Sequence, residues 1–302
     1  MATQPTLKQL KYLCAIARTR HFGQAAASCH VSQSTLSAAI HELEENLGTA
    51  LVERNNKRVY LTKLGEIVVN RSQAILANVS DLVTLCHATA PPFCNELHLG
   101  VIPTIAPFLL PGLLSQLRTD YPDFKLSIRE DLSKPLVERL SDGELDVLLL
   151  ALPYPSQGTE TRHLFYDEFM FACPDSHPLA RTRQVQLSDL YAQDVLLLED
   201  GHCLRDHALE ASKLDRHNLS IPYEATSLNT LVQMVANGMG VTLLPKMAID
   251  AHILTGIPVT IIPFKEKNVW RSIGLMWRNT SPRTEEFKQL GERLLRQRKN
   301  HS

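Results

Sequence analysis

The sequence contains no apolar run long enough to cross a membrane. The stretch from Leu145 to Leu152 is far shorter than the about 20 residues that span a bilayer. The N-terminal stretch, Met1 to Leu10, carries lysines among polar residues instead of the apolar segment of a secretory signal. We therefore expect no membrane partner and a cytoplasmic protein.

Cysteine is sparse and irregularly spaced. None of the six cysteines belongs to a CxxC or CxxH motif, which argues against a structural zinc site, and the chain is long enough to bury a core without disulfides. We expect no metal, no cofactor and reduced thiols. The six are Cys14, Cys29, Cys86, Cys94, Cys173 and Cys203.

Neither sign of charge dominates the chain, because 31 Lys and Arg face 32 Asp and Glu. Residues 1–64 nevertheless carry eight basic and four acidic side chains, a net charge of +4 that leaves −5 for the rest. We call residues 1–64 the head and the rest of the chain the body. A basic head on an acidic body is a weak indication of an anionic partner for the head. With 302 residues, 44% of them hydrophobic, the chain has room for two or three globular domains.

The head has the pattern of a helix-turn-helix. Apolar spacing predicts helices from about Leu7 to Ala17, Phe22 to Cys29 and Gln33 to Leu47, with Ser32 capping the third helix and Gly48 ending it. The start of the third helix exposes short polar side chains of the kind that contact base edges and phosphates. These candidate DNA contacts are Gln33, Ser34, Thr35 and Ser37.

A cluster of this kind, taken alone, is more often a solvated helix start than a DNA contact. The next segment, Leu51 to Leu61, favours the interpretation as a DNA contact. It has the pattern of a hairpin wing whose cations would lie beside phosphates. Its basic side chains are Arg54, Lys57 and Arg58.

Several runs of the head share one family pattern. They are Phe22 to Ala26, Val31 to Ser37, Ile40, Leu43-Glu44, Leu47-Gly48 and Leu51 to Arg54. In this order and with these gaps the head resembles the winged helix-turn-helix of LysR-type transcriptional regulators. The resemblance implies double-stranded promoter DNA and RNA polymerase as partners. His41 departs from the pattern, since family members often carry Arg or Lys there.

A long helix is predicted from Thr62 to about Thr89, which contains no proline. Val68, Ile75 and Leu82 repeat every seven residues, with Val79 and Cys86 as a second seven-spaced pair, and such a narrow stripe usually packs on a copy of itself. Packing against its own chain is the alternative, which the linker Ala90-Pro91-Pro92 disfavours. We expect a homodimer, or a homotetramer as is common in LysR-type regulators.

The body alternates strands and helices. Strands are predicted at 97–101, 125–128, 147–151, 195–198, 241–244 and 259–262, with helices between them that include 108–117 and 136–140. This order predicts a mainly parallel sheet and two lobes with a ligand cleft. Gly238 and Gly240 follow a helix and precede a strand, the reverse of a dinucleotide-binding fingerprint.

The family resemblance implies a body similar to periplasmic binding proteins, in which the chain crosses twice between lobes. We place the crossings near 153–165 and 263–270, and a final helix at 284–296 on the first lobe. The expected α/β organisation is a winged helix-turn-helix at 1–61, a dimerisation helix at 62–92 and a sensor domain at 93–302. Its first lobe comprises 93–164 and 268–302, and its second lobe 165–267.

Cys203 lies at a predicted strand-to-helix turn, where helix amides and the helix dipole stabilise a thiolate. Together with nearby His202 and Arg205 this predicts a lowered pKa and a thiol that attacks peroxide. Asp206, His202 or a bound water would supply the proton to the departing hydroxide. We interpret Cys14, Cys86 and Cys173 as buried apolar residues, and Cys29 and Cys94 as bystanders.

The nine residues from Leu198 to Asp206 resemble the sensing loop of OxyR-type regulators, the hydrogen peroxide sensors within the LysR family. Further matching runs are 102–104, 109–111, 225–228, 242–245 and 271–275. The resemblance implies that Cys203 is the peroxidatic cysteine, that Thr104 holds the peroxide, and that His202 and Asp206 orient the pocket. It also implies that Arg271 polarises the leaving oxygen or stabilises the oxidised cysteine, and that Ser133 stands in for a pocket threonine.

One departure concerns the mechanism. OxyR-type regulators usually carry a resolving cysteine nine residues after the peroxidatic one, where this chain has Ser212. Cys203 would then stop at sulfenic acid, form a mixed disulfide with glutathione, or pair with another cysteine. Alternatively, the body has lost redox switching and binds a small metabolite.

The leading hypothesis is a transcription regulator, not an enzyme, whose output depends on oxidation of Cys203 by hydrogen peroxide. The reduced thiol would be regenerated by glutathione or a thioredoxin-type reductant. A regulator that responds to a metabolite in the cleft is the second hypothesis. A thiol peroxidase with a DNA-binding head is the third, and the missing resolving thiol argues against it.

Overall fold

The computed structural model describes residues 4–55, 58–86, 91–212 and 223–299. The chain forms two compact units, residues 1–89 with 141–144 and residues 90–140 with 145–302.

The first unit is a helix-turn-helix with a wing. Its helices are α1 (Leu7–Thr19), α2 (Phe22–Ser28) and α3 (Gln33–Leu47). The Ser32 side chain accepts a hydrogen bond from the Thr35 amide at the start of α3, and Gly48 ends the helix with φ 67°. The three helices enclose a core that includes Leu13, Ile16 and Leu36. The predicted cap, bounds and end of α3 are confirmed.

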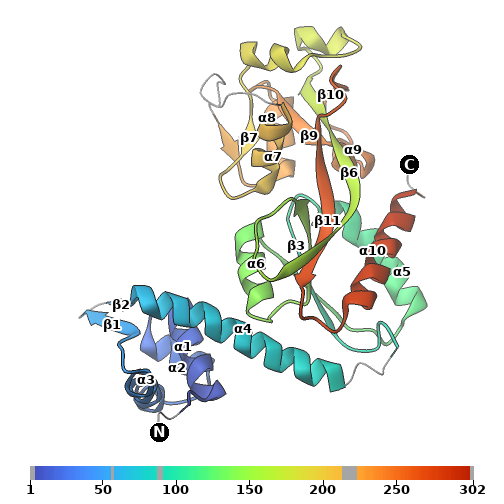
Figure 1. Cartoon of the computed structure of the whole chain (residues 1–302). Coiled ribbons are helices and arrows are strands. Elements are labelled where there is room, and N and C mark those ends of the chain that lie inside the picture. Colours follow the sequence, from blue (N-terminus) through green and yellow to red (C-terminus); the bar gives the residue numbers. More distant parts are fainter. Residues whose placement is uncertain (1–3, 56–57, 87–90, 213–222, 300–302) are drawn as a thin grey trace. The chain divides into compact units, whose positions relative to one another are not determined.

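The wing and a long helix follow. Strands β1 (Val52–Asn55) and β2 (Arg58–Leu61) pair antiparallel, as the hairpin interpretation predicts. Glu44 Oε1 accepts from the amides of Leu51 and Val52 at 2.8 and 3.0 Å, which ties the wing to α3. Helix α4 (Lys63–Cys86) then runs beside α1 (Figure 1).

The apolar stripe of α4 differs in part from the predicted one. Two of the predicted stripe residues, Ile75 and Leu82, are exposed, and the exposed fraction of Leu82 is 61%. Val68 instead packs on the core of the head. The side chain of Cys86 lies outside the described residues. Val68 turns inward because the head covers the N-terminal half of the helix. The exposed stripe consists of Leu64, Ile67, Ile75, Leu82 and Leu85.

The second unit is built on a mixed sheet with strand order β10-β6-β11-β5-β3-β4, in which β9 pairs with β6. Within this sheet, as far as the structure describes it, β3 pairs parallel with β4 and β5 and the other pairs are antiparallel, so the expectation of a mainly parallel sheet is wrong. Two long antiparallel strands, absent from the prediction, cause the difference. The strands are β3 (Leu97–Val101), β4 (Leu126–Glu130), β5 (Val147–Leu152), β6 (Thr159–Pro174), β9 (Thr242–Pro245), β10 (Val259–Ile262) and β11 (Trp270–Arg278).

Strands β6 and β11 connect two lobes with separate cores (Figure 1). The first half of β6 pairs with β11, and from Phe169 onward β6 pairs with β9 and β10. The first crossing therefore lies inside a continuous strand, after the expected 153–165. The second crossing precedes Trp270, where β11 begins.

Helices cover both lobes. The first lobe carries α5 (Ala106–Asp120), α6 (Ser133–Ser141) and α10 (Thr284–Lys299). Phe287, Leu290 and Leu294 of α10 belong to its core, as expected. The second lobe contains the short strands β7 (Leu197–Leu198) and β8 (Glu224–Ala225), with α7 (Cys203–Ser212), α8 (Leu228–Ala236), α9 (Lys246–Asp250) and 3-10 turns at Pro178–Arg181 and Leu187–Ala192.

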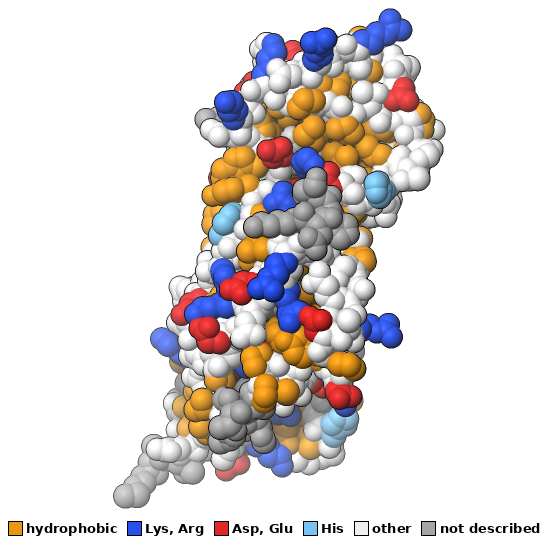
Figure 2. Space-filling view, turned by 90° about the vertical axis from the view of Figure 1, so that its right-hand side faces the viewer, with side chains coloured by type: hydrophobic (Ala, Val, Ile, Leu, Met, Phe, Trp, Pro, Cys, Tyr) orange, Lys and Arg blue, Asp and Glu red, His pale blue; other side chains and the backbone are white. Residues whose placement is uncertain are grey.

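The surface carries mixed charge. On the face shown in Figure 2, basic and acidic side chains lie interspersed, in keeping with a net charge of −1. Across the described ranges, no helix is both long and apolar enough to span a bilayer.

Candidate functional site

The site is built around Cys203, the first residue of α7. Strand β7 ends at Leu198, and the turn to α7 contains Gly201 with φ 100°, a conformation that favours glycine. The Cys203 side chain is 8% exposed and packs into the core of the first lobe, although α7 belongs to the second. The predicted strand-to-helix position of Cys203 is confirmed.

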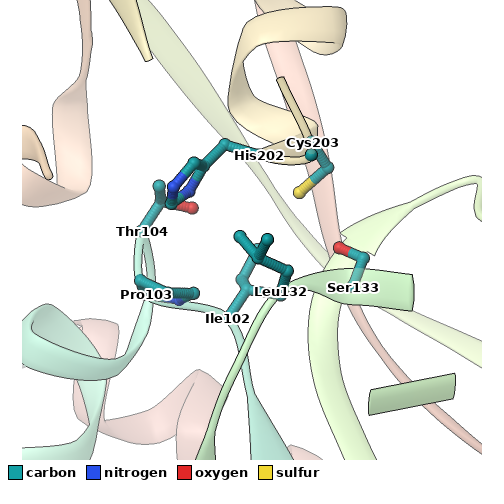
Figure 3. A pocket seen from close by; sticks show the side chains of 8 residues that line it. Ile102, Pro103, Thr104, Leu132, Ser133, His202 and Cys203 are labelled. Carbon is teal, nitrogen blue, oxygen red and sulfur yellow. The ribbon is translucent and has the colours of Figure 1, made fainter. Parts of the chain in front are cut away.

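A small pocket lies in front of the thiol, with an empty volume of about 150 Å³ that includes open solvent. It brings together four of the predicted site residues, Thr104, Ser133, His202 and Cys203 (Figure 3). Its other lining residues are Ile102, Pro103, Leu132 and Gly201. Thr104 and Ser133 come from the first lobe, whereas His202 and Cys203 come from the turn into α7.

Gly201 is favoured by its backbone conformation, and the space around it is also tight. A Cβ atom at this position would lie 3.1 Å from Leu132 Cδ1. The absence of a side chain lets the turn before Cys203 approach the first lobe, which closes one wall of the pocket.

The electrostatics of Cys203 differ from the prediction. Burial raises the pKa of the thiol, while the Ser133 hydroxyl and the positive charge of Arg271 act in the opposite direction. The predicted lowering of the pKa is therefore wrong, because the loss of water around the sulfur outweighs the favourable groups. The Ser133 hydroxyl faces the thiol (Figure 3), and its oxygen is buried with no hydrogen bond of normal geometry within the described residues.

Arg271 lies behind the pocket rather than in its lining. Its Nη1 donates to Thr104 Oγ1 at 2.9 Å and its Nη2 to the Thr104 carbonyl oxygen at 3.0 Å. Its Nε donates to Asp167 Oδ2 at 3.0 Å, and neither side chain of this ion pair is exposed. Arg271 therefore fixes Thr104 and acts on Cys203 through its charge.

Asp167 was not among the predicted residues. It lies on β6 directly opposite Arg271 of β11, and its Oδ1 accepts from the Met247 amide at 2.9 Å. An acidic residue one strand away from a buried arginine can be found only when the pairing of the strands is known.

Two other residues near Cys203 do not line the pocket. Asp206 is exposed and does not line the pocket. Arg205 is buried, but its Nη1 donates to the Leu198 carbonyl at 3.2 Å and to Glu224 at 2.5 Å. A residue two positions along a helix projects from a different face, so the structure does not bring Arg205 to the thiol.

The two histidines of this region are held neutral. Burial lowers the pKa of His202, which lines the pocket. Burial and the charge of Arg271 lower the pKa of His207, which lies one turn after Cys203 on α7 and was not among the predicted site residues. The sequence signal that could have identified His207 is its spacing of four residues from Cys203, which places both on one face of a helix. Ser212 is the last residue of α7, and its side chain is not described.

The predicted DNA-contacting residues lie in the first unit. Gln33, Ser34 and Thr35 are exposed at the start of α3, and Ser37 is half-buried. Arg54 and Arg58 lie on the wing strands, where their side chains are not described, and Lys57 lies outside the described residues. Within the described part of the chain, no group of three or more His, Cys, Asp or Glu could hold a metal ion.

Comparison with known proteins gives two family matches. The family described as bacterial regulatory helix-turn-helix protein, lysR family, matches residues 7–66, and the LysR substrate binding domain matches residues 92–299.

Whole-length relatives agree with these matches. The chain is 40% identical over 287 residues to the HTH-type transcriptional regulator EstR of Acinetobacter baylyi, covering 95% of each chain. It is 36% identical over 288 residues to the hydrogen peroxide-inducible genes activator of Escherichia coli O6:H1, covering 95% of this chain and 94% of the other. A single-site variant of full-length OxyR from Pseudomonas aeruginosa superposes with a TM-score of 0.76 at 33% identity, covering 97% of this chain and 95% of that one.

Proposed function

Because the chain belongs to the LysR family of bacterial transcription regulators, as its resemblance predicted, we propose that this regulator responds to hydrogen peroxide through oxidation of Cys203. DNA binding and transcription regulation follow from the family. The effector and the role of each site residue are the proposal.

The pocket in front of Cys203 is the observation that carries this proposal. Polar groups of Thr104, Ser133 and His202 converge with a thiol on a volume of about 150 Å³, part of it open solvent. The lining of eight residues is short and places three polar side chains beside the thiol, which suits an effector of a few atoms. The relative named as a hydrogen peroxide-inducible genes activator supports peroxide as that effector.

The reaction conserves atoms and electrons. The thiolate sulfur attacks one peroxide oxygen, the S–O bond forms and the O–O bond breaks. The departing hydroxide takes the proton that the thiol released, so the products are Cys203 sulfenic acid and water. Sulfur loses two electrons, which the peroxide gains.

The pocket residues would divide this work. Ser133 favours the thiolate, and Thr104, fixed by Arg271, would orient the peroxide. Neutral His202 would bind a peroxide oxygen or relay the proton. Exposed Asp206 would act only through its charge. With Ser212 at the end of α7, we propose that the switch uses no intramolecular disulfide between these two positions, and that glutathione or a thioredoxin-type protein restores the thiol.

DNA recognition is proposed for the first unit. Gln33, Ser34, Thr35 and Ser37 of α3 would contact bases and phosphates, and Arg54, Lys57 and Arg58 of the wing would contact phosphates. The exposed apolar stripe of α4 would pair two copies and so place two heads on a partly palindromic promoter, where a dimer or tetramer would meet RNA polymerase.

A metabolite-responsive regulator is the second candidate. Two observations favour it, the 40% identity to EstR, whose name does not mention peroxide, and the serine at position 212. A thiol peroxidase is the third, and the relatives are named as regulators instead.

Promoter binding and transcription measured with the full chain before and after a slight excess of peroxide test the proposal. We expect a change with the native protein that is absent in Cys203→Ser and retained in Cys94→Ser, a matched control at an exposed cysteine. A response that survives in Cys203→Ser but disappears in Thr104→Val would identify a metabolite-type pocket. Continuous peroxide consumption with a thiol reductant would identify a peroxidase.

A further inference from the structure

Two buried polar atoms near Cys203 make no hydrogen bond of normal geometry within the described residues. They are Ser133 Oγ and His207 Nδ1. Ser133 faces the sulfur across the pocket, and His207 belongs to the same helix as Cys203. Buried polar atoms are nearly always paired, so two unpaired atoms at one site require a physical reason.

The geometry of α7 directs His207 toward Cys203. The two residues are four positions apart in a continuous helix, which places them on one face. Helical side chains also point back over the preceding turn, and for His207 that turn begins at Cys203. The charge of Arg271 acts on both side chains, which places both near the same guanidinium.

The imidazole of His207 is in the neutral form, which can accept a hydrogen bond. Its low pKa, caused by burial and by Arg271, leaves it uncharged at neutral pH. One nitrogen of a neutral imidazole carries no hydrogen and accepts a hydrogen bond. The reduced thiol is a weak donor, and no hydrogen bond joins it to Nδ1 within the described residues.

We propose that His207 is a specific acceptor for the oxidised state, with its Nδ1 receiving the hydrogen of the Cys203 sulfenic acid. This inference rests on the proposed oxidation of Cys203. The oxygen added to sulfur extends the side chain and supplies a strong O–H donor, which the reduced thiol lacks. Ser133 would donate to the same oxygen.

This hydrogen bond explains how one cysteine can hold a stable oxidised state. In the next oxidation the sulfur of the deprotonated sulfenate attacks a second peroxide, so that an S–O bond forms and the O–O bond breaks. The departing hydroxide takes the remaining peroxide proton and leaves as water, and the product is the sulfinate. A hydrogen bond from S–O–H to His207 keeps the sulfenic acid protonated and slows that step. The protein would then not need a second thiol at position 212.

The test follows sulfenic acid in the full chain, with dimedone as the trapping reagent and peptide mass spectrometry as the readout. His207→Phe and His207→Leu remove the acceptor, whereas His207→Asn keeps an acceptor at the position of Nδ1. After one equivalent of peroxide, a second is added and the conversion of Cys203 to sulfinic acid is timed.

We expect conversion to be roughly 2- to 12-fold faster in the Phe and Leu variants, the change that one net hydrogen bond gives, and close to native in His207→Asn. Denaturation of the reduced proteins should show no loss of stability from a missing hydrogen bond. Equal conversion rates in all four proteins overturn the role of His207 and leave the proposed function intact. If native Cys203 gains no oxygen at all, both fail.

Discussion

Arg271 donates hydrogen bonds to both oxygens of Thr104, from Nη1 to Oγ1 at 2.9 Å and from Nη2 to the carbonyl at 3.0 Å. The guanidinium is itself held by Asp167 inside the protein. Strand β11 of the lobe connection therefore fixes a pocket residue of the first lobe, so a change at the pocket can reach the strands that join the lobes.

This relationship predicts a large cost for removing the arginine. Arg271→Ala should lower the free energy of unfolding by about 3–5 kcal/mol, because Asp167 would keep a buried charge without a partner. Chemical denaturation of the reduced protein measures it. Arg129→Ala, which breaks a partly exposed pair with Asp131, should cost less than about 1 kcal/mol. Equal losses would contradict the buried network.

A side chain at position 201 should cost more than one at a glycine with open space around it. Gly201→Ala forces a positive φ and places a Cβ 3.1 Å from Leu132 Cδ1, so we expect a loss of roughly 1–3 kcal/mol and slower oxidation of Cys203. Gly158→Ala is the matched control, since its φ of 69° is also positive but nothing lies within 4 Å. It should lose stability through the backbone alone, with no change in the oxidation rate.

The oxidation rate should depend on pH in the way a buried thiol requires. Burial raises the pKa of Cys203 above its ordinary 9.0, so the thiolate fraction and the rate should still rise at pH 9.0. Because the folded pKa lies above the unfolded one, the stability linked to this thiol is present below pH 9.0 and decreases as the pH rises through the folded pKa.

Ser133→Ala should lower the rate of Cys203 oxidation at every pH in this range, because the Ser133 hydroxyl favours the thiolate. Stopped-flow measurements of the reaction with peroxide test both expectations. A rate that levels off near neutral pH would show instead that Cys203 is a thiolate of low pKa.

The α4 stripe should hold two copies together. Leu82→Glu places a charge on an exposed leucine of the stripe, so we expect dissociation toward monomers and weaker promoter binding. Asn70→Glu introduces the same residue at an exposed polar position off the stripe. Sedimentation velocity measures the oligomeric state of the two variants, and we expect only Leu82→Glu to dissociate. If Leu82→Glu sediments like the native protein, the stripe is not the dimer contact.

Local signals in the sequence predicted the head well. Helix α3 is bounded by Ser32 and Gly48, whose side-chain cap and positive φ are properties of single residues. Strand β6 was not predicted because its first half, around Thr159 to His163, is charged and largely exposed. Its pairing with β11 depends on contacts about 100 residues apart, which no local pattern contains.

At the candidate site, too, local features were predicted from the sequence, whereas features that depend on contacts between distant residues were not. The turn at Cys203 and its partners Thr104, Ser133 and His202 were predicted, and the pocket brings them together. The pKa of the Cys203 thiol was predicted in the wrong direction, because burial of the sulfur depends on how the first lobe packs around it. Asp167 required the strand register, whereas His207 lay one residue beyond the matching loop and had a readable helical spacing.

Oxidation of Cys203 by peroxide can be followed by peptide mass spectrometry of the reduced protein after a slight excess of peroxide. We expect that Cys203, although 8% exposed, gains one oxygen within seconds and before the exposed Cys94, because the pocket and not accessibility controls the reaction. Cys203 that stays reduced while Cys94 and other thiols oxidise slowly would contradict peroxide sensing and favour a metabolite in the pocket.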